Sequence, residues 1–309
     1  MAKLQTQQLI LLCLCGGLLI ARVVVQLLGK RLSEKDRLNL TQRIQSWAIM
    51  VALLFIGLLN PLLTTLLFGL ISFLGLKEYF SMISFRPKDR LLLVLLYLSI
   101  PVQYYFVYTG WYIMFLVFVP VYIFILLAVV ITLEQEVEGV LKTSGILYWG
   151  VMINLYSVSH LAYLLHMSPP QLSIPSTHLI LYLIMLTELN DICQYLFGRT
   201  LGHRRIIPVV SPNKTIAGFA GGACSTLLLS ALLGQALLPG VPLPLLFLFG
   251  GVIGVFGFCG DIFLSAIKRD LHIKDTSQLI PGHGGILDRI DSLILVSPLF
   301  FHIFAFVYF

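Results

Sequence analysis

The chain has 309 residues, of which 58% are hydrophobic and 11% charged, and its formal net charge is +6. Soluble globular domains carry about 25% charged residues, so this composition excludes a protein whose whole surface faces water. The positive charge is compatible with nucleic acid or anionic lipid as a partner, and the positions of the basic residues decide between them.

Apolar segments long enough to cross a bilayer, which takes about 20 residues, follow one another along the whole chain. The sequence therefore predicts an all-α, polytopic integral membrane protein with about nine or ten transmembrane helices. We divide these helices into an N-terminal group, residues 1–145, and a C-terminal group, residues 146–309. The expected spans are 8–28, 47–60, 62–76, 91–107, 111–133, 146–166, 178–198, 216–236, 244–265 and 291–309. The second and third are short and meet at Asn60 and Pro61, which predicts a tight hairpin.

Basic residues occupy every second connection between the predicted spans. Apart from Lys3 and Arg22, all of the 20 lysines and arginines lie in five stretches. These stretches are 30–43, 77–90, Lys142, 199–214 and 268–289. Positively charged loops stay in the cytoplasm, so this asymmetry predicts a multi-pass protein of the cytoplasmic (inner) membrane with both termini on the opposite side. Because the charges follow this topology rule, nucleic acid is excluded as a partner.

Ionisable side chains inside membrane spans are costly and therefore mark functional candidates. Glu188 and Asp191 lie three residues apart, on one face of the span 178–198. Asp261 lies close to the cytoplasmic end of the span 244–265. The spacing of these acids is compatible with an enzyme site and equally with the ion relay of a membrane transporter. The neighbouring loops separate these alternatives.

The loop before the span 216–236 ends in residues 211–215, which read SPNKT. Thr215 is a suitable N-cap for the helix that follows. A helix N-terminus presents unpaired N–H groups and the positive end of its dipole to an anion, and Lys214 adds a point charge there. The segment therefore predicts contact with a phosphate group.

Residues 265–291 alternate basic and acidic side chains, whereas a loop that only anchors a helix needs the basic ones alone. Acids beside a basic phosphate site indicate a divalent metal, and magnesium prefers one or two carboxylates together with substrate phosphates. Residues 281–285, PGHGG, predict a flexible turn that places His283 between glycines. Asp288 and Asp291 follow, one turn apart near the N-terminus of the last helix.

The segment 265–291 resembles the signature of the CTP:phosphatidate cytidylyltransferases, also called CDP-diacylglycerol synthases. That signature reads Ser-x-x-Lys-Arg, four residues, Lys-Asp, and then Pro-x-His-Gly-Gly-x-x-Asp-Arg-x-Asp, and every fixed position is present at its spacing. Two earlier segments are similar to the same family, residues 191–199 and residues 211–215. The resemblance covers 178–309.

The resemblance implies an enzyme, a nucleotidyltransferase that converts CTP and phosphatidic acid into CDP-diacylglycerol and pyrophosphate in phospholipid biosynthesis. In this reaction the lipid phosphate attacks the α-phosphorus of CTP, which requires positioning and charge neutralisation more than covalent help from the protein. The catalytic region is then 146–309, with its site facing the cytoplasm where soluble CTP and a membrane lipid can meet. The family also implies a homodimer.

The resemblance further assigns roles to individual residues. Magnesium, with a potassium ion beside it, is expected on Asp261 and Asp288. The expected catalytic residues are Asp191, Lys214, Lys268, Asp275, His283 and Asp291. The expected substrate-binding residues are Arg199, Ser211, Thr215, Ser265, Arg269, Lys274, Gly284, Gly285 and Arg289.

The chain departs from the family pattern at two places. Ala217 stands where the family usually carries a glutamate, and residues 192–194, ICQ, replace small residues. Glu188 is a candidate replacement for the missing carboxylate. These departures keep a different acceptor open, either another lipid phosphate or a polyprenol, and also an inactive regulator. An ion-coupled transporter stays the alternative from another class of protein.

Overall fold

The computed structural model describes residues 2–28, 33–133, 138–172 and 174–309. Its α-helices are α1 (Ala2–Leu28), α2 (Glu34–Gly57), α3 (Pro61–Ser81), α4 (Arg90–Thr109), α5 (Tyr112–Val117), α6 (Phe124–Leu133), α7 (Val140–Val151), α8 (Ser157–Tyr163), α9 (Ser176–Leu201), α10 (Ile216–Leu237), α11 (Leu243–Asp270) and α12 (Leu287–Tyr308). Short turns of other helix types join them, namely η1 (Pro87–Asp89), η2 (Phe118–Ile123), η3 (Met152–Tyr156) and η4 (Leu164–His166).

Within the described residues, nine helices are long and apolar enough to cross a membrane. They are α1, α2, α3, α4, the rod Tyr112–Leu133, α9, α10, α11 and α12. This result confirms the predicted polytopic all-α fold. One of the ten expected spans, 146–166, is not among these nine. It is divided between α7, η3, α8 and η4. Its buried polar side chains, such as Asn154 and His160, suit packing against protein rather than against lipid.

The second helix begins well before the predicted start at residue 47. Ser33 caps it by accepting a hydrogen bond from the Asp36 N–H at 3.1 Å, and α2 starts at Glu34. Hydropathy misses these first turns because they are polar, and several of their side chains line a cavity. The basic residues of this stretch from Lys35 onward therefore lie on a helix, while Lys30 and Arg31 lie outside the described residues.

The predicted hairpin at Asn60 and Pro61 is confirmed. Asn60 accepts a hydrogen bond from the Leu63 N–H at 2.9 Å, and Pro61 occupies the first position of α3. Proline suits that position because its missing N–H would have no partner within the helix. The helix α3 then continues past the predicted end at residue 76 and carries Glu78 in its last turns.

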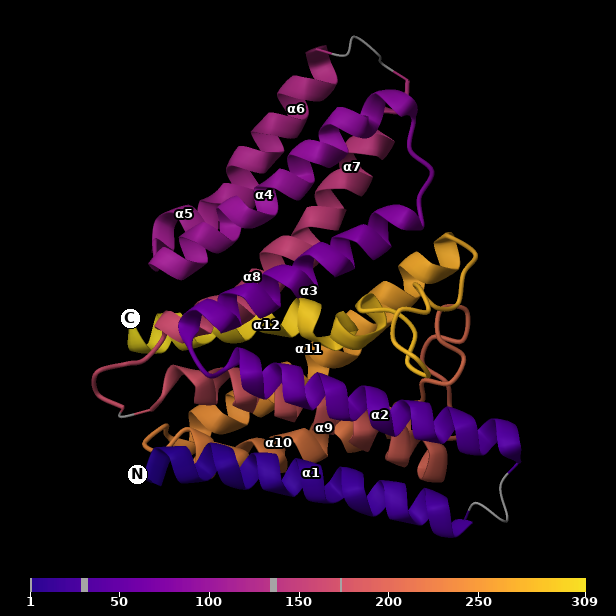
Figure 1. Ribbon diagram of the computed structural model, residues 1–309, viewed down its shortest axis with the longest axis vertical. Coiled ribbons are helices and arrows are strands. Elements are labelled where there is room, and N and C mark those ends of the chain that lie inside the picture. The colour runs from indigo at the N-terminus through magenta and orange to yellow at the C-terminus, as the bar shows by residue number, and fades with distance from the viewer. Residues whose placement is uncertain (1, 29–32, 134–137, 173) are drawn as a thin grey trace.

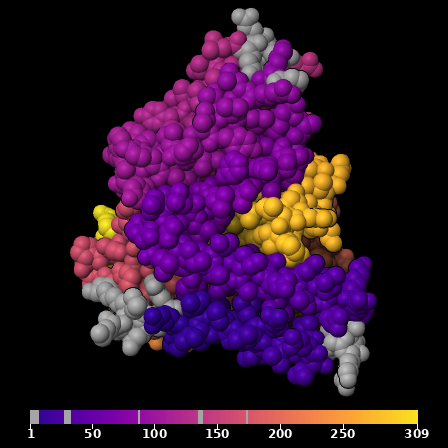
Figure 2. Space-filling model, viewed as in Figure 1, coloured from indigo at the N-terminus to yellow at the C-terminus, as the bar shows by residue number. Residues whose placement is uncertain are grey.

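The helices place the long loops at one end of the molecule. Helices α9, α10, α11 and α12 pack consecutively along one another, α3 contacts α8 and α12, and α4 to α7 tilt away as an arm (Figure 1). Both chain ends lie at one end, and the loops 202–215 and 271–286 lie at the other (Figure 1). The yellow-orange segment that contains the second loop reaches the surface between N-terminal helices (Figure 2).

Candidate active site

Two ion pairs join segments that are distant in sequence. The Lys214 ammonium, just before α10, lies 2.5 Å from an oxygen of Asp261 on α11. The Lys268 ammonium, in the last turn of α11, lies 2.7 Å from an oxygen of Asp288 at the start of α12. Four residues that were singled out in the sequence thus meet as two pairs. Each lysine holds its charge beside a carboxylate, where phosphate oxygens would also be attracted.

A third acid, Asp191, lies near the Lys214–Asp261 pair and has a carboxylate oxygen without a hydrogen-bond partner in the described part of the chain. One oxygen of Asp191 on α9 accepts a hydrogen bond from the Ser292 hydroxyl at 2.8 Å. Its other oxygen is buried and has no hydrogen-bond partner among the described residues. The carboxylates of Asp191, Asp261 and Asp291 lie close enough to repel one another, so this region attracts cations.

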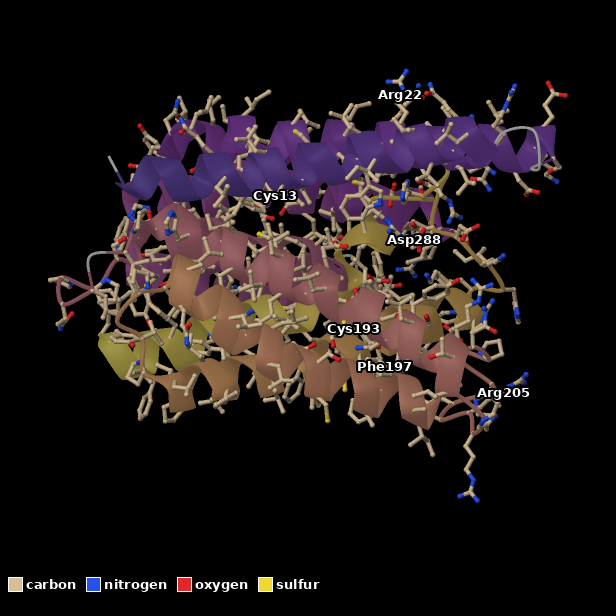
Figure 3. The ribbon with its side chains drawn as sticks, turned by 90° about the horizontal axis from the view of Figure 1, so that it is seen from below. Cys13, Arg22, Cys193, Phe197, Arg205 and Asp288 are labelled. Atoms are coloured by element: carbon tan, nitrogen blue, oxygen red, sulfur yellow. The ribbon has the colours of Figure 1, made fainter. Side chains whose placement is uncertain are left out.

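Asp288 organises the loop that precedes α12. Its Oδ2 atom accepts hydrogen bonds from the Thr276 N–H at 3.0 Å, the Thr276 hydroxyl at 2.9 Å and the Gly285 N–H at 3.1 Å. Together with Lys268, these donors use both carboxylate oxygens. Figure 3 shows Asp288 inside the loop-bearing end of the molecule, whereas Arg205 points outward from that end.

The glycine turn has a backbone shape that other residues adopt poorly. The Ile280 N–H donates to the Gly284 carbonyl at 2.8 Å, and the His283 N–H donates to the Ile280 carbonyl at 2.9 Å. Gly282 and Gly284 have φ angles of +76° and +84°, in the left-handed region that favours glycine. A side chain on Gly284 would also press against the Asp288 carboxylate. Gly284 is therefore needed for the shape of the loop as well as for the expected substrate contact.

His283 lies on this turn under the second helix. Its ring meets the Trp47 ring edge-on, with centroids 6.0 Å apart. Burial and the nearby positive charge of Arg289 lower the pKa of His283 below its usual value, because both disfavour the protonated ring. The imidazole is therefore neutral at neutral pH.

Two cavities flank Asp191 and Tyr195, which line both. The smaller has a volume of about 370 Å³ and reaches the first turn of α10. Its other expected site residues are Arg199, Lys214 and Thr215. The larger has a volume of about 1100 Å³ and extends beneath α2. Its lining includes Lys274, Asp275, His283, Gly284 and Arg289 from the expected site, Glu188, and Asn39, Gln42, Arg43 and Trp47 from α2.

The remaining expected residues make local contacts. Thr215 is confirmed as the N-cap of α10, accepting from the Gly218 N–H at 3.1 Å. The Ser265 hydroxyl donates to Asp261 at 3.3 Å, and the Ser211 carbonyl accepts from the Lys214 N–H at 3.3 Å. Arg269 is exposed, and its guanidinium donates to backbone carbonyls of Val210 and Ile273 rather than pointing into either cavity. These contacts leave their expected roles toward substrate as predictions.

Sequence reasoning missed Glu78, which α3 brings to the loop before α12. This side chain is 6% exposed, accepts hydrogen bonds from three groups between residues 277 and 287, and lies 3.3 Å from the Thr276 hydroxyl. Its signal in the sequence is a lone acid directly after the predicted span 62–76, beside the basic Lys77. That position puts Glu78 at the same end of the molecule as the expected site.

The acids suit a metal ion that is bound jointly by carboxylates and substrate phosphates better than one bound by protein side chains alone. In the part of the chain that the structure describes, no group of three His, Cys, Asp or Glu residues is arranged to hold a metal ion. Magnesium commonly uses one or two carboxylates and completes its shell with substrate phosphates and water. The unpartnered oxygen of Asp191, close to Asp261, fits that requirement.

Comparison with known proteins gives the family. A model of the cytidylyltransferase family matches residues 41–307. Uncharacterized protein YnbB from Escherichia coli (strain K12) is 40% identical over 287 residues, which is 92% of this chain and 94% of that protein.

Two named enzymes match over a shorter segment. Phosphatidate cytidylyltransferase from Bacillus subtilis (strain 168) is 41% identical over 129 residues, 41% of this chain and 47% of that enzyme. Phosphatidate cytidylyltransferase from Chlamydia trachomatis serovar D is 44% identical over 128 residues, 40% of this chain and 42% of that enzyme. The match thus covers less than half of each enzyme. Since the family model spans most of this chain, the prediction is confirmed: the protein belongs to the cytidylyltransferase family and is a nucleotidyltransferase.

Proposed function

We propose that the protein transfers the cytidylyl group of CTP to phosphatidic acid, giving CDP-diacylglycerol and pyrophosphate. The observation that supports this most strongly is the Lys214–Asp261 pair beside Asp191, where two cavities share a wall. A second pair, Lys268 with Asp288, ties α11 to the start of α12. Two substrates must approach each other in this reaction, and both are phosphate anions. Paired lysines and acids can bind such anions while keeping the local charge balanced.

The reaction needs no covalent intermediate on the protein. An oxygen of the lipid phosphate attacks the α-phosphorus of CTP, the bond from that phosphorus to the bridging oxygen breaks, and pyrophosphate leaves. The lipid phosphate is already ionised at neutral pH, so no strong general base is required. In our proposal Lys214, Lys268, Lys274 and Arg289 hold phosphate oxygens, and the turn with His283 shapes the nucleotide side. Their contribution is positioning and charge neutralisation.

Magnesium is part of this proposal, with potassium beside it. Asp261 and Asp288 are the proposed ligands, and Asp191 and Asp291 lie alongside as further carboxylates. The metal would supply neutralisation of the triphosphate charge. The lysines that balance Asp261 and Asp288 would then be available to substrate phosphates.

The topology of the protein completes the proposal. All lysines and arginines of residues 146–309 lie in the stretches 199–214 and 268–289, which favours a cytoplasmic position of the site in the inner membrane. CTP is soluble and phosphatidic acid lies in the membrane, so both can reach the end where the loops gather. A homodimer, as the family resemblance implies, is proposed as the assembly.

Pyrophosphate release by the purified protein tests this function. Wild-type protein with CTP, phosphatidic acid and magnesium should release pyrophosphate and form CDP-diacylglycerol. Asp288→Asn should abolish this activity, whereas Asp270→Asn, an exposed acid at the end of α11, should retain it. Release without a lipid acceptor, or full activity of the Asp288 variant, would contradict the proposal.

A related acceptor is the second candidate, favoured by one finding. YnbB matches across nearly the full length of the chain, whereas the two phosphatidate cytidylyltransferases named above match over less than half of it. The site also lacks the usual glutamate at Ala217. Labelled CTP offered with phosphatidic acid, other lipid phosphates and polyprenols, in parallel, would identify the acceptor by the labelled lipid that forms.

A further inference from the structure

The buried Glu78 side chain is the main polar link between α3 and the loop that leads into α12. Its Oε1 atom accepts from the Ser277 hydroxyl at 2.6 Å and the Ile286 N–H at 2.9 Å. Its Oε2 atom accepts from the Leu287 N–H at 3.0 Å and, more weakly, lies 3.3 Å from the Thr276 hydroxyl. Glu78 is 6% exposed, so these groups, rather than water, supply the hydrogen bonds that its carboxylate accepts.

This arrangement replaces the cap that α12 cannot make for itself. The residue before α12 is Ile286, which has no side-chain oxygen, and no local side chain caps the helix. The first N–H groups of a helix have no partner within it and carry the positive end of the dipole. Glu78 satisfies two of them from another helix and brings a negative charge to that end.

Glu78 and the proposed metal ligand Asp288 both accept hydrogen bonds from the same segment, residues 276–287. The Thr276 hydroxyl lies 2.9 Å from Asp288 Oδ2 and 3.3 Å from Glu78 Oε2, and it favours the shorter bond to Asp288. Gly285 donates its N–H to Asp288 at 3.1 Å, and a side chain there would collide with Thr276 and Glu78. Any shift of Glu78 therefore moves the loop against Asp288.

We propose that Glu78 is a positioning residue for the transferase site: by capping α12 from α3, it fixes the place of Asp288 relative to Asp191 and Asp261. The inference rests on the proposed function for its catalytic consequence. Glu78 does not line either cavity that flanks Asp191, so it acts through Asp288. It also gives α3 a role in a site whose expected catalytic residues all lie between residues 191 and 291.

The test compares Glu78→Gln with Asp89→Asn in detergent-purified protein. Asp89 is a matched control because it is 1% exposed, follows the same helix and pairs with Arg86 at 2.9 Å, outside both cavities. The glutamine variant keeps the size of the side chain but replaces one acceptor oxygen with an NH₂ donor. Two measurements are made on each variant: hydrogen–deuterium exchange of residues 276–290, and the magnesium dependence of pyrophosphate release.

In Glu78→Gln, the backbone amides of residues 276–290 should exchange faster than in wild type. The magnesium concentration for half-maximal activity should rise about 10- to 100-fold, as it does when other groups that orient metal ligands are replaced. The KM for the lipid should change less than the magnesium concentration for half-maximal activity. Asp89→Asn should alter neither measurement, even if it lowers thermal stability. If Glu78→Gln does not fold, Thr276→Val, which loses the hydroxyl between the two acids, should show the same changes more weakly.

Wild-type exchange and wild-type magnesium dependence in a folded Glu78→Gln variant would overturn the inference. So would equal changes in Asp89→Asn, since they would reflect a general loss of stability. Wild-type protein that releases no pyrophosphate would instead refute the proposed function. Hydrogen–deuterium exchange would still test whether Glu78 caps α12 in that case, because the measurement does not require an active enzyme.

Discussion

Several polar side chains that α9 and α12 bring to the site are incompletely hydrogen-bonded, whereas Glu78 of α3 and Ser46 of α2 are hydrogen-bonded to the segment before α12. Among the described residues, buried atoms without a partner include Asp191 Oδ1, Gln194 Nε2 and Arg289 Nε. On the other side, Glu78 accepts from the Ser277 hydroxyl and from the N–H groups of Ile286 and Leu287, and the Ser46 hydroxyl donates to the Pro281 carbonyl at 2.8 Å.

This difference indicates a division of work. A buried polar atom without a partner costs about 1–3 kcal/mol, and a bound ligand, an ion or an ordered water can remove that cost. In the proposed function, the unpartnered atoms of Asp191, Gln194 and Arg289 are available to substrate or metal. The fully bonded side chains of α2 and α3 hold the loop in place, and substitutions on the two sides should have different effects.

The largest loss of activity is expected from Lys214→Met. This change removes the cation paired with Asp261 and leaves that acid with an unbalanced charge, so pyrophosphate release should fall about 100-fold or more. Arg205→Met, an exposed basic residue of the same loop, is the control and should stay near wild type. Equal losses in both variants would mean that the loop contributes only its general positive charge.

A substitution in the glycine turn separates backbone strain from contact with Asp288. Gly284→Ala should lose stability by about 1–2 kcal/mol from its positive φ alone. It should also lose activity, because the added carbon presses on the Asp288 carboxylate.

Gly139→Ala is the matched control for that experiment. Gly139 has a φ of +76°, and no described atom lies within 4 Å of the added carbon. Thermal unfolding in detergent should show a similar loss of stability, with activity retained. If both alanine variants lose activity alike, strain and not the Asp288 contact explains the requirement.

A smaller effect is expected from Ser46→Ala on the fully bonded side. The change removes the hydrogen bond to Pro281, which should cost about 1 kcal/mol of stability and only a few-fold in activity. Ser144→Ala, which removes a hydroxyl bonded to its own helix at Val140, is the control. A loss as large as that of Lys214→Met would remove the distinction between the two sides.

The smallest effect concerns pH. Because burial and Arg289 lower the pKa of His283 below its ordinary value of about 6.5, the ring is mainly neutral between pH 8 and 6.5 and takes up its proton at lower pH than an ordinary histidine. His283→Gln should therefore keep the shape of the activity profile over that interval, whatever its effect on the rate. A loss of wild-type activity near pH 6.5 that disappears in the variant would show that His283 titrates there.

Some parts of the site were accessible from local sequence and others were not. The cap at Thr215 follows from one residue at a helix start, and its local signal is sufficient. The start of α2 was missed because its first turns are polar and face a cavity rather than lipid. Hydropathy measures preference for lipid, so it does not detect helical turns whose side chains are polar and exposed or line a cavity.

Composition, apolar length and a fixed signature are local properties, so they were enough to predict the membrane class, the all-α fold, the family and the residues able to carry charge. Which charges meet depends on the packing of the helices: Lys214 with Asp261, Lys268 with Asp288, and Glu78 with the start of α12. The bond from Glu78 to Leu287 crosses 209 positions of the chain, a separation over which no local pattern carries information.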